Sequence, residues 1–193
     1  AYKHVSFGEE NSHTMIKNNI IGTKKIIEFA CKNNIKNFTF ISSDKAVNPK
    51  SILGYTKKIG EKLLNEFYLK YSKKKELNFS IVRFGNVIGS SGSVIPLFLK
   101  QVKNKEFLTV TNKNSERYFM SISEAVRLVI NSSYINKSGF KIFALNMGKQ
   151  LKIYDIASRI IKLSGYSIKN KFNPKGDISI KIIGLKKGEK ISE

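Results

Sequence analysis

The chain has 193 residues, 41% of them hydrophobic, so it is long enough for one domain and part of a second. It contains no run near the roughly 18 consecutive apolar residues of a membrane span, which predicts a soluble, cytoplasmic chain. The formal net charge of +21 comes almost wholly from lysines spread over every predicted element, so we expect a solvated surface and no nucleic-acid partner.

The amino-terminal region carries the first predicted helix. Residues 1–5 read AYKHV, and apolar residues at three- and four-residue spacings then predict a helix from about Ser12 to Lys32. No Gly-rich run of the kind that holds a pyrophosphate follows a predicted strand anywhere in the chain. We therefore expect the chain to be the carboxyl-terminal part of a longer protein.

Two apolar strands flank a long helix in the next region. Asn37 to Ser43 and Asn78 to Phe84 are predicted strands, and Tyr55 to Tyr71 is a predicted helix between them. This order of strands and long helices is typical of a parallel, doubly wound α/β sheet, which is the fold class we expect.

A polar loop follows the first of these strands. Asp44 and Lys45 stand at the strand end, and Lys57 lies in the first turns of the helix that follows. Open α/β sheets bind ligands at the carboxyl ends of their strands, so these three ionisable groups can converge over one cleft. The pattern predicts a site for proton transfer.

A glycine- and serine-rich loop, residues 85–93, follows the second strand and can approach a ligand through its backbone. Its alternative interpretation is a surface turn. Beyond it the predicted elements are shorter: helices at Val94–Lys103, Ile122–Tyr134 and Ile153–Leu163, and strands at Phe107–Val110, Lys141–Leu145 and Ile178–Ile183.

Three separated runs resemble one enzyme family. Residues 42–58 read SSDKAVNPKSILGYTKK, residues 83–96 read RFGNVIGSSGSVIP, and residues 116–122 read ERYFMSI. In order and spacing they resemble motifs of the nucleotide-sugar 4,6-dehydratases of capsular polysaccharide biosynthesis, a branch of the extended short-chain dehydrogenases/reductases.

The resemblance implies a division of the chain. Residues 1–92 are expected to form the carboxyl-terminal half of a Rossmann-like domain that carries the active-site segment. Residues 93–193 are expected to form a smaller, mostly substrate-binding α/β part, with some elements returning to the main sheet. The complete protein is expected to be a homo-oligomer, and its association with a membrane is left open.

The resemblance also assigns catalytic roles around the first loop. Lys45 corresponds to the base that removes the sugar C5 proton, and Asp44 to the acid that protonates the departing C6 hydroxyl. Ser43 offers a hydroxyl near C4, and Lys57 binds the nicotinamide ribose. Leu53 stands where most short-chain dehydrogenases carry a tyrosine, and leucine has no proton to move.

Ligand-binding residues follow from the same resemblance. The cofactor is NAD or NADP, and the residues assigned to it are Tyr2, Lys3, Asn19 and Lys57. The partner is a UDP-sugar substrate, and the residues assigned to it are Asn86, Ser90, Ser91, Arg117, Lys186 and Glu189. No metal is expected.

The resulting hypothesis is NAD(P)-dependent dehydration of a UDP-N-acetylhexosamine, with UDP-N-acetylglucosamine preferred, to a 4-keto-6-deoxy sugar nucleotide for surface polysaccharide. One alternative is a 4-epimerase of the same fold, which normally needs the tyrosine that Leu53 replaces. Another is a truncated remnant that binds a sugar nucleotide without turnover. We expect this chain to be inactive alone, because the cofactor-binding front half is missing.

Overall fold

The computed structural model describes residues 1–73 and 75–193, and the chain divides into two compact units. The first unit comprises residues 1–85 and 123–146. The second comprises residues 86–122 and 147–193. The expected division near residue 92 stays a prediction, and each unit is described by itself below.

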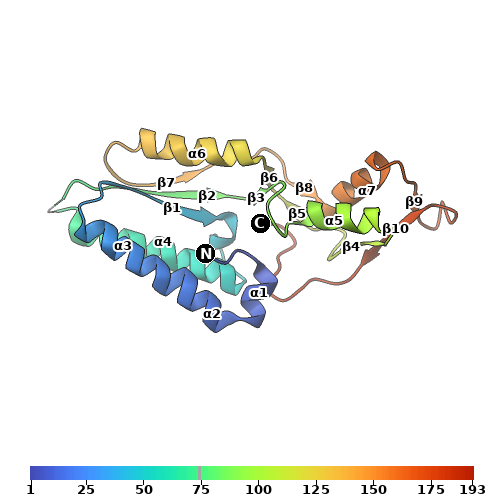
Figure 1. Cartoon of the computed structure of the whole chain (residues 1–193), viewed down its shortest axis with the longest axis horizontal. Coiled ribbons are helices and arrows are strands. Elements are labelled where there is room, and N and C mark those ends of the chain that lie inside the picture. Colours follow the sequence, from blue (N-terminus) through green and yellow to red (C-terminus); the bar gives the residue numbers. More distant parts are fainter. Residues whose placement is uncertain (74) are drawn as a thin grey trace. The chain divides into compact units, whose positions relative to one another are not determined.

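The first unit is built on a parallel sheet of three strands in the order β1-β2-β7. The strands are β1 (Asn37–Ser43), β2 (Asn78–Phe84) and β7 (Gly139–Ala144). Figure 1 shows α6 (Ile122–Ile135) over one face of the sheet, and the helices of residues 23–71 over the other. Helices on both faces of a parallel sheet confirm the predicted doubly wound α/β class.

The helix predicted from Ser12 to Lys32 forms in three continuous segments. They are α2 (Ser12–Ile16), the π-helical η1 (Lys17–Gly22) and α3 (Thr23–Lys32). A short helix that the sequence did not predict, α1 (Val5–Glu10), precedes them and buries only Gly8. A helix with a single buried position has no repeating spacing of apolar residues, so the sequence could not predict it.

The helix between β1 and β2, α4 (Ile52–Tyr71), begins three residues before the predicted Tyr55. Ser51 caps it, because its side chain accepts a hydrogen bond from Gly54 N at 3.1 Å. The carboxylate of Glu9 on α1 accepts a second bond from Ile52 N at 2.8 Å. Two side-chain acceptors at the amino end thus extend the helix into the loop that follows β1.

The core of the first unit lies between the sheet and the helices α3 and α4. Its buried residues come from α3, β1, α4, β2 and the residue before β2: Ile27, Cys31, Phe40, Leu64, Leu77, Phe79 and Ile81. Gly60 on α4 allows the Phe40 ring to lie against the helix, since an added Cβ would come within 2.6 Å of that ring. The core therefore fixes α4 directly over β1.

The second unit has its own parallel sheet, in the order β4-β10-β9. Its principal elements are α5 (Val94–Lys103), β4 (Leu108–Val110), α7 (Ile153–Leu163), β9 (Ile168–Lys169) and β10 (Ile178–Ile182). Two small pairs complete it: β3 (Asn86–Val87) with β6 (Phe119–Met120), and β5 (Glu116–Arg117) with β8 (Leu151–Lys152). Its core comprises Phe98, Val102, Leu108, Val110, Ile153, Ala157, Ile161 and Ile178.

Across the described part of the chain, every helix is too short or too polar to cross a membrane.

Candidate active site

A tight turn follows β1 and carries the residues predicted to be catalytic. The turn is the 3-10 helix η2 (Asp44–Ala46), and Ser43 precedes it as its cap. The Ser43 hydroxyl accepts a hydrogen bond from Lys45 N at 3.3 Å and donates one to Asp44 Oδ1 at 2.9 Å. In an extended strand, neighbouring side chains would point to opposite faces, so this turn supplies the bend that the sequence could not show.

Asp44 and Lys45 consequently form an ion pair. Lys45 Nζ donates to Asp44 Oδ1 at 3.0 Å, and the two side chains are 15% and 10% exposed, respectively. The second carboxylate oxygen, Asp44 Oδ2, is buried and has no hydrogen-bond partner among the described residues. A buried oxygen without a partner is costly, so Oδ2 is the unsatisfied acceptor of this turn.

Gly54 allows the turn to lie against α4, and the sequence reasoning missed it. An added Cβ at Gly54 would lie 2.4 Å from the carbonyl oxygen of Lys45 and 3.0 Å from Pro49 Cβ. Glycine is disfavoured in helices, so its position inside the first turn of α4 was a signal of close packing that could have been read.

Lys57 lies against the end of β1. Its Nζ donates to Ile41 O at 2.9 Å and lies 5.2 Å from the centre of the Phe40 ring. Burial lowers the pKa of Lys57, and the negative charge of Glu61, one helical turn later, opposes that shift. Lys57 is thus a cation held at the sheet edge where ligands of such folds bind.

Asn19 joins the amino-terminal segment to the helices. Its side chain is 2% exposed: Oδ1 accepts from Tyr2 N at 2.8 Å, and Nδ2 donates to Tyr2 O at 2.9 Å and to Thr56 Oγ1 at 3.3 Å. The Asn19 amide is therefore occupied by protein groups. Lys3 and the Tyr2 ring are exposed.

Leu53 is an apolar, buried residue of α4, only 3% exposed. Its carbonyl accepts from Thr56 Oγ1 at 2.8 Å, while Tyr55 is 52% exposed. No hydroxyl stands at this position of the helix, so the hydroxyl beside the Asp44–Lys45 pair belongs to Ser43.

The residues predicted to bind the substrate all lie in the second unit. Arg117 is 9% exposed, and its guanidinium donates to the backbone carbonyls of Glu116, Lys190 and Ile191 at 2.7, 2.7 and 2.9 Å. Lys186 and Glu189 close a turn, with Lys186 N donating to the Glu189 carboxylate at 3.1 Å. Asn86 lies on β3, and the loop with Ser90 and Ser91 follows it. Their roles toward a substrate stay predictions.

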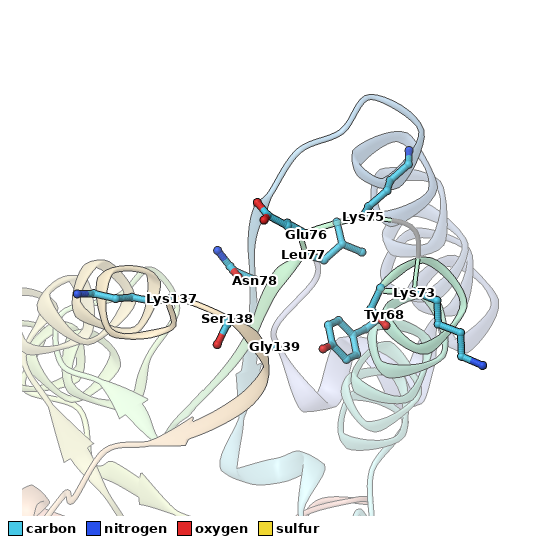
Figure 2. A pocket seen from close by; sticks show the side chains of 10 residues that line it. Tyr68, Lys73, Lys75, Glu76, Leu77, Asn78, Lys137, Ser138 and Gly139 are labelled. Atoms are coloured by element: carbon cyan, nitrogen blue, oxygen red, sulfur yellow. The ribbon is translucent and has the colours of Figure 1, made fainter.

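A cavity of about 530 Å³ in the first unit lies elsewhere (Figure 2). Asn78 and Gly139, the first residues of β2 and β7, line it, so it lies at the edge of the sheet opposite to the Asp44 turn. Figure 2 shows the side chains of Lys73, Lys75 and Lys137 pointing away from it. Among residues 1–73 and 75–193, no group of three or more His, Cys, Asp or Glu side chains could hold a metal.

Comparisons with known proteins match the whole chain. A family model described as "Polysaccharide biosynthesis protein" matches residues 1–193. The capsular polysaccharide biosynthesis protein CapD of Staphylococcus aureus is 44% identical over 193 residues, which are 100% of this chain and 30% of that protein. An inverting UDP-N-acetylglucosamine 4,6-dehydratase of Campylobacter jejuni is 32% identical over 100% of this chain and 53% of that protein.

Solved structures share the fold. Pen from Bacillus thuringiensis superposes with a TM-score of 0.88 at 37% identity, covering 99% of this chain and 55% of that one. A dTDP-glucose 4,6-dehydratase from Streptomyces venezuelae, with NAD and TYD bound, superposes with a TM-score of 0.81 at 14% identity, covering 100% and 61%. The chain therefore spans between 30% and 61% of the length of these four proteins.

Proposed function

The chain belongs to the polysaccharide biosynthesis protein family, and from that premise we propose that its protein is an NAD(P)-dependent UDP-N-acetylhexosamine 4,6-dehydratase. The product is a 4-keto-6-deoxy sugar nucleotide for surface polysaccharide, and UDP-N-acetylglucosamine is the preferred substrate. The observation that carries the proposal is the partly buried Asp44–Lys45 pair at the carboxyl end of β1. The similarity of the chain to the Campylobacter dehydratase supports the choice of substrate.

The residues at the sheet edge fit one side of a nicotinamide cofactor. Lys57 uses a hydrogen of its ammonium on Ile41 O, and an ammonium has three donors, so it can also bind a ribose hydroxyl. The side chain of Asn19 bonds both backbone groups of Tyr2 and so fixes the amino-terminal segment. The next residue, Lys3, is exposed on that segment. A nicotinamide held by these residues would supply the hydride chemistry, from sugar C4 and back to C6.

Lys45 and Asp44 divide the elimination between them. The neutral amine of Lys45 removes the C5 proton, which is acidic beside the C4 ketone, and the protonated Asp44 gives its proton to the departing C6 oxygen. Asp44 Oδ2 is the oxygen suited to that second role, because Oδ1 already accepts from Ser43 and Lys45. The C6 hydroxyl leaves as water with the proton from Asp44, and the C5 proton stays on Lys45.

The ion pair can supply both protonation states by itself. A proton that moves over the 3.0 Å contact from the Lys45 ammonium arrives at Asp44 Oδ1 and leaves the neutral amine as the base. Rotation of the carboxyl group then turns the acid O–H into the position of Oδ2, toward the sugar C6. The net charge of the pair does not change, so the buried site accepts no extra charge. The elimination then returns the pair to its ionised state.

Two alternatives make different predictions. A 4-epimerase would need a hydroxyl at position 53, and the buried Leu53 disfavours it. A remnant without turnover would bind a sugar nucleotide and leave it unchanged. We further propose that these 193 residues are inactive alone, since they span only 53% of the similar dehydratase.

The test is a turnover assay with UDP-N-acetylglucosamine and NAD or NADP, which follows the 4-keto-6-deoxy product. It compares this chain with a version extended upstream through a Gly-rich loop, and with Lys45→Ala and Lys50→Ala in the extended version. Lys50 is an exposed lysine of the same loop and serves as the matched control. We expect turnover only in the extended protein. Lys45→Ala should abolish it, and Lys50→Ala should leave it unchanged. An extended protein that binds both ligands and never turns over would favour the binding remnant.

A further inference from the structure

Glu61 is a buried carboxylate on α4 to which the mechanism above gives no role. It is 6% exposed: Oε1 accepts from Ser42 Oγ at 2.5 Å and from Arg83 Nε at 2.8 Å, and Oε2 accepts from Arg83 Nη2 at 2.5 Å. Ser42 on β1 and Arg83 on β2 are direct partners in the parallel ladder. One carboxylate thus joins the helix to both strands, one residue before each strand ends.

This network lies next to Lys57 on the same helix. Residues four apart on a helix share a face, so the Lys57 and Glu61 side chains leave α4 on one side. Lys57 Nζ bonds Ile41 O, and Glu61 bonds the side chain of the following residue, Ser42. Two consecutive residues of β1 are therefore held by two charged residues from adjacent turns of α4.

The partly buried ion pair of Glu61 and Arg83 is a poor source of stability by itself. Burying an ion pair costs desolvation energy that its attraction only partly returns, and apolar packing at the same place does as well. The rest of the α4 contact with β1 and β2 is apolar, as the core residues Phe40, Leu64 and Ile81 show. The charge on Glu61 therefore calls for a reason besides packing.

We propose that Glu61 is a positioning residue for the active site: with Arg83 and Ser42 it holds α4, and with it Lys57, against the end of β1, and it fixes the strand end that carries Asp44. Its part in catalysis rests on the dehydratase function proposed above. The placement of Lys57 does not, because it follows from contacts within the first unit.

The electrostatics around Lys57 agree with this role. Burial is the largest influence and lowers the pKa of Lys57, whereas the Glu61 carboxylate raises it. Arg83 on β2 carries the positive charge that opposes Glu61. Its hydrogen bonds to Glu61 raise the pKa of Arg83. Other charged groups on elements packed against α4 include the mutually paired Asp44 and Lys45 of η2.

The test measures the state of Lys57 directly in this chain. Acetic anhydride acylates neutral amines, and peptide mass spectrometry gives the rate at Lys57, with the neighbouring Lys58 as internal reference. Glu61→Gln removes the carboxylate, so we expect acylation of Lys57 to accelerate several-fold. Arg83→Gln removes the positive charge that offsets Glu61. The carboxylate then stabilises the charged form of Lys57 more strongly, so we expect acylation of Lys57 to slow several-fold. Glu66→Gln, an exposed carboxylate of the same helix, is the matched control and should change nothing.

The opposite signs separate positioning from simple loosening. If both Glu61→Gln and Arg83→Gln accelerate acylation, or neither changes it, the proposal is overturned. Glu61→Asp and Arg83→Lys keep the charges and should bring the rates back toward those of the unchanged chain. They also provide folded variants should the glutamine forms unfold.

A second arm uses the extended protein in the turnover assay. There, Glu61→Gln should lower kcat and weaken NAD binding, and Glu61→Asp should recover part of both. An extended protein with no dehydratase activity would contradict the proposed function and leave the acylation result standing. Unchanged kcat and NAD binding in Glu61→Gln, in an active enzyme, would overturn the positioning role in catalysis.

Discussion

Asp44 of the first unit and Arg117 of the second are both charged and nearly buried, yet they differ in how far protein groups satisfy them. Asp44 keeps one carboxylate oxygen without a hydrogen-bond partner among the described residues. Arg117 spends three hydrogen bonds on the backbone carbonyls of Glu116, Lys190 and Ile191. Both residues lie in motifs of one enzyme family, but the Asp44 carboxylate keeps an unsatisfied oxygen, whereas the Arg117 guanidinium also lies 3.9 Å from the Glu193 carboxylate. A shared motif therefore does not by itself show how far protein groups satisfy its charged residues.

The strongest way to break this comparison is Asp44→Asn in the extended protein. The amide keeps the shape of the carboxyl and cannot donate an acid proton, so turnover should fall by roughly 10²–10⁴-fold, the usual contribution of general acid catalysis. The thermal midpoint should change little, because Ser43 and Lys45 still have an oxygen to bond. Asp155→Asn, at an exposed position on α7, is the control and should leave both unchanged. Full activity in Asp44→Asn would remove Asp44 from the mechanism.

Arg117→Met tests the other side of the comparison. The change deletes three charge-assisted, partly buried hydrogen bonds to backbone carbonyls, so the free energy of unfolding should fall by about 2–4 kcal/mol in urea. Hydrogen exchange of residues 190–193 should accelerate as well. Arg159→Met, at an exposed position on α7, should cost little. If Arg117→Met instead leaves stability intact and raises only the KM for the sugar nucleotide, Arg117 is a substrate ligand.

Gly54→Ala sharpens the comparison, because it moves the Asp44 turn without altering a charge. Alanine normally stabilises a helix by up to about 1 kcal/mol relative to glycine. Here the added Cβ would lie 2.4 Å from Lys45 O, so the turn must shift, at a cost of about 1–3 kcal/mol. We expect a small net loss of stability in a urea titration and a clear loss of turnover. Gly22→Ala, whose added Cβ meets nothing nearer than Lys17 O at 3.9 Å, should show neither.

The sequence predicted most of the fold where apolar patterns were long. The bounds of β1, β2, α5 and α7 agree with the prediction, because each combines a run of apolar residues with a clear polar break. The pairs of two-residue strands in the second unit are too short to produce a period. Their positions depend on contacts between segments far apart in the chain.

The candidate site was predictable in its residues and not in its geometry. The motif placed Asp44 and Lys45 together, but the bend of η2 depends on the Ser43 cap and on the missing side chain at Gly54. The bonds of Glu61 to Arg83, 22 residues away, and of Arg117 to Ile191, 74 residues away, have no local pattern. Side chains satisfied by distant backbone or side-chain groups are the part that a single sequence does not reveal.

The smallest expected effect concerns Asp177, an exposed aspartate of the second unit that contrasts with Asp44. Its Oδ2 accepts from Ser167 N and from Ser167 Oγ, each at 2.7 Å. These bonds lower the pKa of Asp177 below its ordinary value of 3.8, the side-chain bond being the larger cause. As the pH is lowered, Asp177 therefore takes up its proton in the unfolded chain before it does so in the folded chain. The stabilisation is complete above pH 3.8 and is lost as the pH falls through the folded-state pKa.

Asp177→Asn should consequently be slightly less stable than the unchanged chain at pH 6, and the difference in urea midpoint should shrink as the pH is lowered below 3.8. Asp155→Asn, at an exposed position on α7, controls for the loss of one negative charge from a strongly basic chain. A difference that stays constant from pH 6 to acid would mean that the ionised carboxylate is not what Ser167 stabilises. In that case hydrogen bonding, rather than charge, would account for this structural aspartate, and the contrast with Asp44 would rest on burial alone.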